Sequence, residues 1–249
     1  MHDEHYMGLV AEWYDEWLKE RTGDINYYSD FFHDFDGRIL ELACGTGRLL
    51  IPIAQSGIQI DGLDSSKDML VILKEKAARL GLKDIGLYNQ SMEEFTISTK
   101  YDAIFAGGGA IQLLVSPESA MNSLKCIRKH LSAKGFFLAD IFIPWENIYQ
   151  RKCDDYHVTR DRTHPDGRRS IVLERFEIDI SEQLKRGTYR YEFYEQKRLV
   201  ECITDDLSIR WYWKDEFLNL LREAGFSNIE ILTQSSLYYE GYAFVFKAM

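Results

Sequence analysis

Two closely spaced glycines follow the first strongly apolar run of the chain. The run ends at Ala43, and Gly45 and Gly47 come shortly after it. Glycine allows a tight backbone turn and lets a bound molecule approach without a Cβ atom in the way. The next apolar run ends at Asp64, whose carboxylate can accept hydrogen bonds from both hydroxyls of a ribose. These residue types, in this order, predict a nucleoside site.

Each of these residues also has a structural interpretation. A Gly-x-Gly turn can be a tight connection between a strand and a helix, and Asp64 can cap the helix that follows. Ser65, with Asp68 three residues later, gives that helix a capping signal of its own. The dinucleotide fingerprint needs a third glycine where this chain has Leu50, and Arg48 stands in the turn. A nicotinamide-dependent oxidoreductase is therefore disfavoured.

Three segments carry a resemblance to class I S-adenosylmethionine (SAM) dependent methyltransferases. ELACGTG at 41–47 resembles motif I of that family, in which the first acid, here Glu41, helps to fix the methionine end of SAM. DSSKDML at 64–70 resembles the ribose-and-adenine stretch, with Met69 against the adenine, and QSMEEF at 90–95 resembles the segment at the adenine edge, where Ser91 replaces a common Asp. The implied SAM-binding residues are Glu41, Ala43, Gly45, Gly47, Asp64, Ser65, Met69, Ser91, Met92 and Ala106.

The candidate catalytic residues also come from the resemblance. YDAIFAGGGAIQLL at 101–114 resembles motif IV, which lies beside the transferred methyl group, and Gln112 occupies a position that is often polar or His in relatives. The three glycines at 107–109 either open room for a substrate or form a flexible loop without a role. RWYWKDEFLNLLREAGF at 210–226 resembles a late helix and strand of the family, which points to Arg210. Tyr14 belongs to a Tyr-Asp pair that is similar to a subgroup of small-amine methyltransferases, including aminodeoxysugar and glycine-type N-methyltransferases.

Methyl transfer explains why the chain shows no fixed catalytic triad. The cofactor supplies the reactive methyl group, and the protein supplies geometry and a route for one proton. The leading interpretation is a SAM-dependent methyltransferase acting on a nitrogen or oxygen of a small molecule. The alternatives are a protein or tRNA methyltransferase, and a SAM- or nucleoside-binding module without turnover.

Short apolar runs alternate with helical patterns between residues 38 and 142, which predicts strand–helix repeats and a parallel sheet. Together with the resemblance, this gives the expected fold: an α/β, Rossmann-like, doubly wound, mostly parallel seven-stranded sheet with an inserted antiparallel β meander. The expected parts are an N-terminal helical cap (1–36), a SAM-binding core (37–150), the β insertion (151–210) and the C-terminal part of the core (211–249).

The insertion is expected from a change of pattern after Ile143. Aromatic, β-branched and charged segments are separated by predicted turns at 165–167 and 185–187. Because ligands bind outside the carboxyl ends of parallel strands, an insertion after the fifth strand is expected to form a lid that selects the acceptor. Tyr189 and Tyr191 share one strand face, so both can line a pocket, whereas Tyr194 points to the other face.

Composition narrows the choice of partners. A formal charge of −10 and a pI near 5.2 disfavour nucleic acid, whose binders usually present a basic face. The four cysteines and six histidines form no ligand pattern, so no metal is expected. No apolar run reaches the length of a membrane span and no signal segment stands at the start, so a cytoplasmic protein is expected. A homodimer remains an open alternative.

Overall fold

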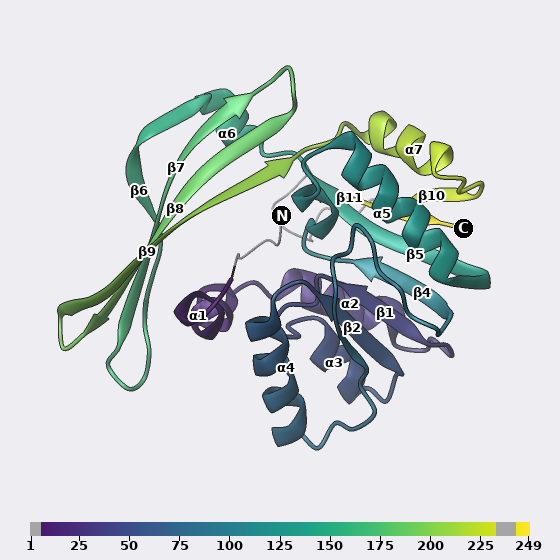
Figure 1. Ribbon diagram of the computed structural model, residues 1–249, viewed down its shortest axis with the longest axis horizontal. Helices are drawn as coiled ribbons and strands as arrows, with labels where there is room; N and C mark the ends of the chain where they lie inside the picture. The colour runs from purple at the N-terminus through teal and green to yellow at the C-terminus, as the bar shows by residue number, and fades with distance from the viewer. Residues whose placement is uncertain (1–5, 233–242) are drawn as a thin grey trace.

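The computed structural model describes residues 6–232 and 243–249, so residues 1–5 of the expected N-terminal cap lie outside the described residues. It contains a seven-stranded sheet in the order β10-β11-β5-β4-β1-β2-β3 (Figure 1). The strands are β1 (Ile39–Leu42), β2 (Ile60–Asp64), β3 (Leu87–Asn89), β4 (Tyr101–Ala106), β5 (Leu131–Phe142), β10 (Ile229–Leu232) and β11 (Ala243–Ala248). The first five strands are parallel, whereas β11 runs antiparallel to β5 and β10. This confirms the expected Rossmann-like, doubly wound α/β fold.

Helices cover both faces of this sheet because its strands are apolar on both sides. Ile39 packs on one face, with α2 (Gly23–Phe32), α3 (Leu50–Gln55) and α4 (Lys67–Arg79). Leu40 and Leu42 pack on the other, with α5 (Pro117–His130) and α7 (Lys214–Glu223). Such burial on both faces is typical of parallel sheets. Within the described residues, every helix falls short of the length and apolarity that a membrane span requires.

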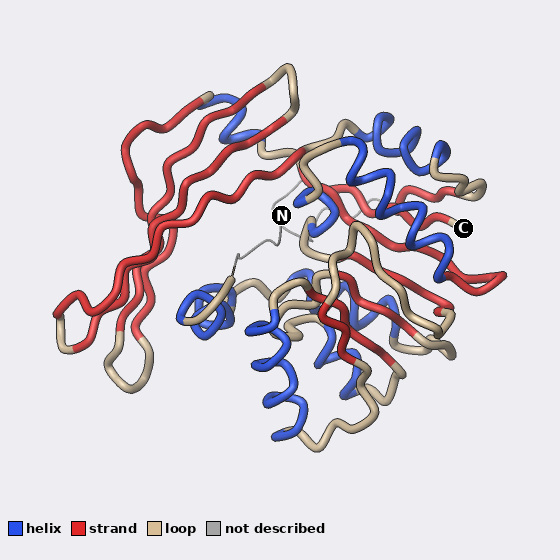
Figure 2. The backbone as a smooth tube through the Cα atoms, in the orientation of Figure 1, coloured by secondary structure: helices blue, strands red, loops and turns tan. Residues whose placement is uncertain are grey.

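A separate four-stranded antiparallel sheet, here called the meander, leaves the core after β5. Its strands are β6 (Lys152–Thr163), β7 (Arg169–Asp179), β8 (Leu184–Glu195) and β9 (Arg198–Arg210), paired in sequence order. A short helix, α6 (Trp145–Gln150), precedes it. Figure 2 shows the two sheets side by side, with strands of the meander extending well beyond the core. The expected antiparallel insertion is therefore confirmed.

The turns of the meander only partly match the sequence interpretation. The turn at 165–167 is confirmed, because it joins β6 to β7. The predicted turn at 185–187 is wrong, since those residues belong to β8. A Cβ atom at Gly187 would lie 2.9 Å from the ring of Tyr189, so this glycine gives packing room inside a strand. The hairpin between β8 and β9 turns at Gln196 and Lys197, both with positive φ (46° and 66°), and was not predicted.

The N-terminal helix α1 (Leu9–Leu18) contacts both the meander and the core (Figure 1). Trp13 and Trp17 are buried against apolar side chains of β7 and β8, and the Trp17 indole donates a hydrogen bond of 2.7 Å to Ser170 Oγ. On the core side, Asp15 accepts hydrogen bonds from Thr46 Oγ1 (2.5 Å) and Lys76 Nζ (2.6 Å). The amphipathic pattern of the sequence thus reflects a helix that joins two parts of the molecule.

Candidate active site

A cavity of about 530 Å³ lies between the carboxyl ends of the parallel strands and the meander. Its core wall comes from the residues after β1, β2 and β4, and its opposite wall comes from α1 and from strands β6, β8 and β9. Volumes of this size hold small molecules and cofactors. We call it the central cavity.

Asp64 stands at the end of β2, on the floor of the central cavity. Its Oδ2 accepts the backbone N–H of Gly45 (2.7 Å), and its Oδ1 accepts that of Ser66 (2.8 Å). Burial raises the pKa of Asp64, and these two N–H groups act in the opposite direction. The capping role expected of Ser65 belongs to Ser66, whose hydroxyl accepts the N–H of Met69 at 3.3 Å. Asp64 therefore both holds the glycine turn and lines the cavity.

The two motif I glycines serve different purposes. Gly45 has φ of +53°, and a Cβ atom added there would meet nothing within 4 Å, because the position opens onto the central cavity. Gly47 has φ of +81°, but its Cβ would lie 2.8 Å from the side chain of Leu73. Gly47 thus allows the turn to pack on α4, whereas Gly45 leaves room for a ligand.

Glu41 places a buried carboxylate beside this turn. The residue is 3% exposed, and among the described residues its Oε2 has no hydrogen-bond partner. Burial raises the pKa of Glu41 well above its ordinary value, while the positive charge of Arg48 opposes that rise. A buried acid with one unsatisfied oxygen is suited to an ammonium group, because pairing would offset the cost of its desolvation.

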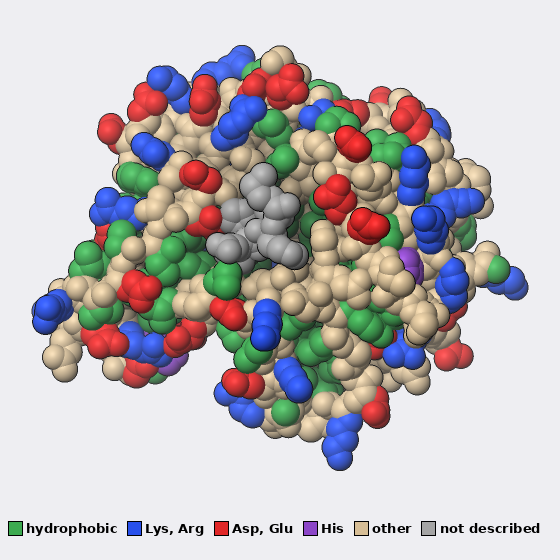
Figure 3. Space-filling model, viewed as in Figure 1, with side chains coloured by type: hydrophobic (Ala, Val, Ile, Leu, Met, Phe, Trp, Pro, Cys, Tyr) green, Lys and Arg blue, Asp and Glu red, His purple; other side chains and the backbone are tan. Residues whose placement is uncertain are grey.

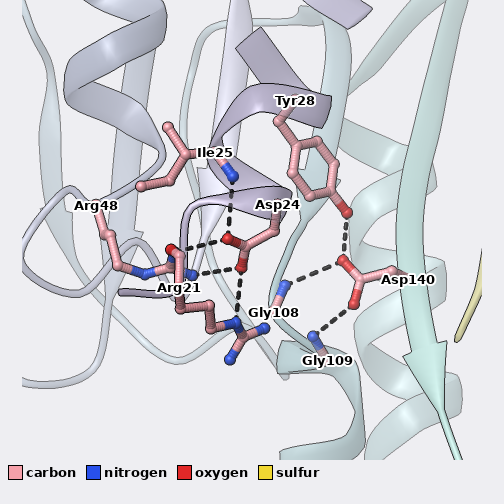
Figure 4. A network of polar contacts seen from close by, with 8 residues as sticks. All are labelled: Arg21, Asp24, Ile25, Tyr28, Arg48, Gly108, Gly109 and Asp140. Atoms are coloured by element: carbon pink, nitrogen blue, oxygen red, sulfur yellow. Dashed lines mark hydrogen bonds and ion pairs between the residues drawn. The ribbon is translucent and has the colours of Figure 1, made fainter. Parts of the chain in front are cut away.

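Arg48, in the same turn, is held by a residue far away in the sequence. Its guanidinium makes two hydrogen bonds of 2.8 and 2.6 Å to the carboxylate of Asp24, which is fully buried at the start of α2 (Figure 4). Arg21 reaches the same carboxylate at 3.0 Å. The bidentate pair fixes the Arg48 side chain along one wall of the central cavity.

A second buried acid holds the loop after β4. Asp140, on β5, accepts the N–H groups of Gly108 (3.0 Å) and Gly109 (2.8 Å) and the hydroxyl of Tyr28 (Figure 4). A Cβ at Gly109 would lie 2.6 Å from the ring of Phe142. The interpretation as a flexible loop is therefore wrong, because hydrogen bonds and close packing fix this backbone beside the cavity. No local pattern in the sequence points to Asp140 or Asp24, since their partners are remote along the chain.

Aromatic side chains line the opposite wall. Tyr14 of α1 has Tyr6 edge-on to it, with ring centroids 5.4 Å apart. Burial raises the pKa of Tyr14, and the nearby charges of Arg48 and Arg21 oppose the rise. Tyr189 and Tyr191 of β8 face the cavity, whereas Tyr194 lies on the other face and donates to Glu192, as the strand alternation predicts.

Residues 39–135 match a family model described as a methyltransferase domain. This part of the chain is therefore similar to a methyltransferase domain. The putative methyltransferase YqeM of Bacillus subtilis is 28% identical over 129 residues, which are 51% of this chain and 48% of that protein. The chain spans about half the length of the curated relatives it matches, with shares of 48%, 60% and 53%.

Solved structures match almost the whole chain at low identity. A SAM-dependent methyltransferase from Clostridium acetobutylicum superposes with a TM-score of 0.75 at 16% identity, over 96% of this chain and 97% of that one. The sugar N-methyltransferase KedS8 from a Streptoalloteichus species superposes with a TM-score of 0.73 at 17% identity, over 95% and 92%. These likenesses show the fold, and with the domain match they confirm the resemblance to class I methyltransferases.

Most of the predicted site residues come together around the central cavity. Those that line the central cavity are Tyr14, Glu41, Ala43, Gly45, Asp64, Ser65, Met69, Ser91 and Met92. Their contacts with a cofactor or an acceptor stay predictions. Gly47 and Ala106 do not line the cavity: Gly47 packs on α4 as described above, and Ala106 is fully buried in the core.

The other two candidates, Gln112 and Arg210, lie outside the cavity and hold the chain at the root of the meander. Gln112, in the short 3₁₀ helix η1 (Ala110–Leu113), donates to the carbonyls of Phe142 (2.9 Å) and Arg210 (3.1 Å) and accepts the N–H of Phe142 (2.8 Å). Arg210 itself donates to the carbonyl of Glu182 at 2.9 Å. These two residues thus fix the two ends of the insertion, and neither lines the central cavity.

Among residues 6–232 and 243–249, there is no group of three or more His, Cys, Asp or Glu side chains that could hold a metal ion. All four cysteines are free thiols, and two of them, Cys44 and Cys126, are buried.

Proposed function

We propose that the protein transfers a methyl group from SAM to a nitrogen or oxygen atom of a small-molecule acceptor. The observation that carries the proposal is the central cavity itself. One end of it holds the glycine turn with Asp64 and Glu41, and the other end is walled by Tyr14, Tyr189 and Tyr191. A nucleoside-type cofactor and a second small molecule therefore have adjoining places.

The core wall offers partners for each part of SAM. Each oxygen of Asp64 accepts one backbone N–H and keeps lone-pair capacity for a ribose hydroxyl. Glu41 provides the unsatisfied carboxylate oxygen for the ammonium of the methionine end. Met69 and Met92 supply apolar contacts for the adenine, and Ser91 stands beside them. When bound, SAM supplies a methyl group on a sulfonium sulfur, which a nucleophile can displace in line.

The protein contributes to the reaction by positioning the two reactants and by keeping water away from them. Holding two reactants in contact removes much of the entropic cost of their encounter, which is worth about 7 to 11 kcal/mol in well-oriented cases. The hydroxyl of Tyr14 is protonated at neutral pH, because the ordinary pKa of tyrosine is about 10 and burial raises it further. It is therefore suited to donate a hydrogen bond that orients the acceptor, or to pass on its proton while accepting another.

We further propose that the meander forms the acceptor wall, as a lid over the SAM-binding core. The cavity wall opposite the glycine turn includes Arg160, Tyr189 and the segment 206–209 of β9. This supports a core that binds SAM and a meander that binds the acceptor. The N-terminal helix α1 belongs to the same wall, because Tyr14 and Trp17 also line the cavity.

A small acceptor is favoured over a protein or tRNA because the walls of the cavity include α1 and the meander as well as the core. On the face drawn in Figure 3, basic side chains are interspersed with acidic ones, and the whole chain carries a formal charge of −10. Nucleic-acid binders instead gather basic side chains on one face. The similarity in fold to a sugar N-methyltransferase agrees with a small acceptor.

The test combines SAM binding with transfer of a labelled methyl group. Calorimetry is expected to show SAM binding, and labelled SAM is expected to modify members of a panel of small amines and alcohols but not bulk protein or tRNA. The Asp64→Ala variant serves as the cofactor-deficient control. SAM binding with no transfer to any acceptor would favour the binding module, and transfer only to protein or tRNA would replace the small-molecule proposal.

A further inference from the structure

The register of strand β6 places one arginine of the meander, Arg160, at the central cavity. Arg160 on β6 lines the central cavity. A bulge at Thr159 shifts the register by one residue, so that Arg160 pairs with Val172, which in turn pairs with Tyr191. Directly paired residues of an antiparallel sheet share a face, and bulges re-aim side chains next to functional sites. Arg160 therefore lies on the cavity face, beside Tyr191.

Neighbouring arginines have acidic partners, whereas Arg160 has none in the part of the chain that the structure describes. Arg162 on the same strand pairs with Glu20 at 2.8 Å, and Arg169 on β7 pairs with Asp161 outside the cavity. Across the cavity, Arg48 is held by Asp24. Among residues 6–232 and 243–249, Arg160 makes neither a hydrogen bond nor an ion pair, although it is only partly exposed.

The surroundings of Arg160 include aromatic hydroxyls and two acids of β9. Its charge acts on Tyr6, Tyr14 and Tyr191, in each case against the burial that raises the pKa of the hydroxyl. Asp206 of β9 lines the same stretch of wall and makes no ion pair with Arg160 in the described structure. The charge of the neighbouring Asp205 acts on Tyr6 and Tyr191 in the sense opposite to that of Arg160. A half-buried guanidinium that makes no ion pair is costly, and its planar fork matches a carboxylate or a phosphate.

We propose that Arg160 binds an anionic group, a carboxylate or a phosphate, on the methyl acceptor. The inference rests on the proposed function and specifies its substrate class: a small amine or alcohol that also carries an acid group. The anion is held by the meander, and the nucleophilic atom lies toward the glycine turn. Arg160 is then the residue that selects charged acceptors over neutral ones.

The test compares probes that differ only in charge. S-adenosylhomocysteine-saturated protein is titrated with glucosamine 6-phosphate and glucosamine, and with 4-aminobutyrate and its amide. The wild type is expected to bind at least one anionic probe about 10- to 100-fold more tightly than its neutral partner, the range expected for charge-assisted hydrogen bonds. Arg160→Met should abolish that preference, and Arg160→Lys should restore part of it because the charge returns without the fork.

The matched control is Arg169→Met, which removes the same charge from the neighbouring strand outside the cavity and should keep the preference. SAM affinity, measured on all four proteins, separates the two proposals. If SAM fails to bind the wild type, the proposed function and this inference both fall. If SAM binds equally to all four but no anionic probe is preferred, or the preference survives in Arg160→Met, only the inference is overturned. Whichever pair shows the preference distinguishes phosphate from carboxylate.

Discussion

Replacement of Asp64 by alanine tests the cofactor end of the cavity most directly. The substitution removes a carboxylate that the proposal assigns to the ribose of SAM. Two charge-assisted hydrogen bonds would be lost, and we expect SAM binding to weaken by about 1.5 to 3 kcal/mol, or about 10- to 150-fold in Kd. The structure adds a second effect, because Asp64 also accepts the N–H groups of Gly45 and Ser66.

The effect on folding can be estimated from the same contacts. Losing the acceptor of a buried N–H costs about 1 to 3 kcal/mol, and the N–H of Ser66 is buried. Against this, the variant no longer buries a carboxylate whose pKa is raised by desolvation. We therefore expect Asp64→Ala to fold with a free energy of unfolding lowered by about 1 to 3 kcal/mol.

The matched control is Asp61→Ala on the same strand. Asp61 is also buried and accepts a backbone N–H from Gly86 at 2.8 Å, but it does not line the central cavity. Urea unfolding should show a loss of stability in both variants, whereas calorimetry should show weaker SAM binding only in Asp64→Ala. Equal SAM affinity in folded Asp64→Ala and the wild type would refute the assignment of Asp64 to the ribose.

Three further outcomes are expected. Gly45→Val should weaken SAM binding by about 100-fold or more, because a branched side chain is strained at positive φ and occupies cofactor space. The control is Gly57→Val, which is also at positive φ but lies outside the cavity. It should lose stability and keep its affinity for SAM. Burial raises the pKa of Glu41 above its ordinary value of 4.5. Above pH 4.5 the folded protein therefore still holds a proton that the unfolded chain has released. The free energy of unfolding should fall as the pH rises from there. Urea unfolding at several pH values should show a shallower fall in Glu41→Gln, and identical slopes would contradict this. Methyl transfer should survive EDTA, since the described residues offer no metal cluster; loss of activity that a divalent ion restores would reveal a missed site.

The parallel core could be predicted from the sequence because it depends on local signals. Apolar runs alternate with helical periods, and the strand–turn–acid order around Gly45 and Asp64 fits within a few dozen residues. Glu41, Met69 and Ser91 were assigned to the cofactor from the resemblance to family motifs, and all three line the cavity. Adjacent parallel strands bring such positions together.

The misplaced residues depend on information that no local pattern contains. Gly47 was assigned to the cofactor from the resemblance to motif I. A glycine can leave room either for a ligand or for a packed side chain, and only the distance to Leu73 shows that packing is the reason here. Gln112 has the polarity of a site residue, but it is satisfied by backbone groups at both ends of the insertion. Arg160 could not be singled out, because a one-residue bulge decides which face of β6 it occupies.

The way Gln112 joins Phe142 to Arg210 has a consequence for how this protein can diversify. One side chain reaches both ends of the insertion, so the chain leaves the core and returns to it at nearly the same place. Segments with adjacent ends can be inserted or exchanged without distorting the host. The meander also pairs its strands only with one another in the described structure. The meander can therefore be exchanged as a unit. Recombination at residues 143 and 210, with a matching α1, should give the protein a new acceptor preference and leave the SAM-binding part unchanged.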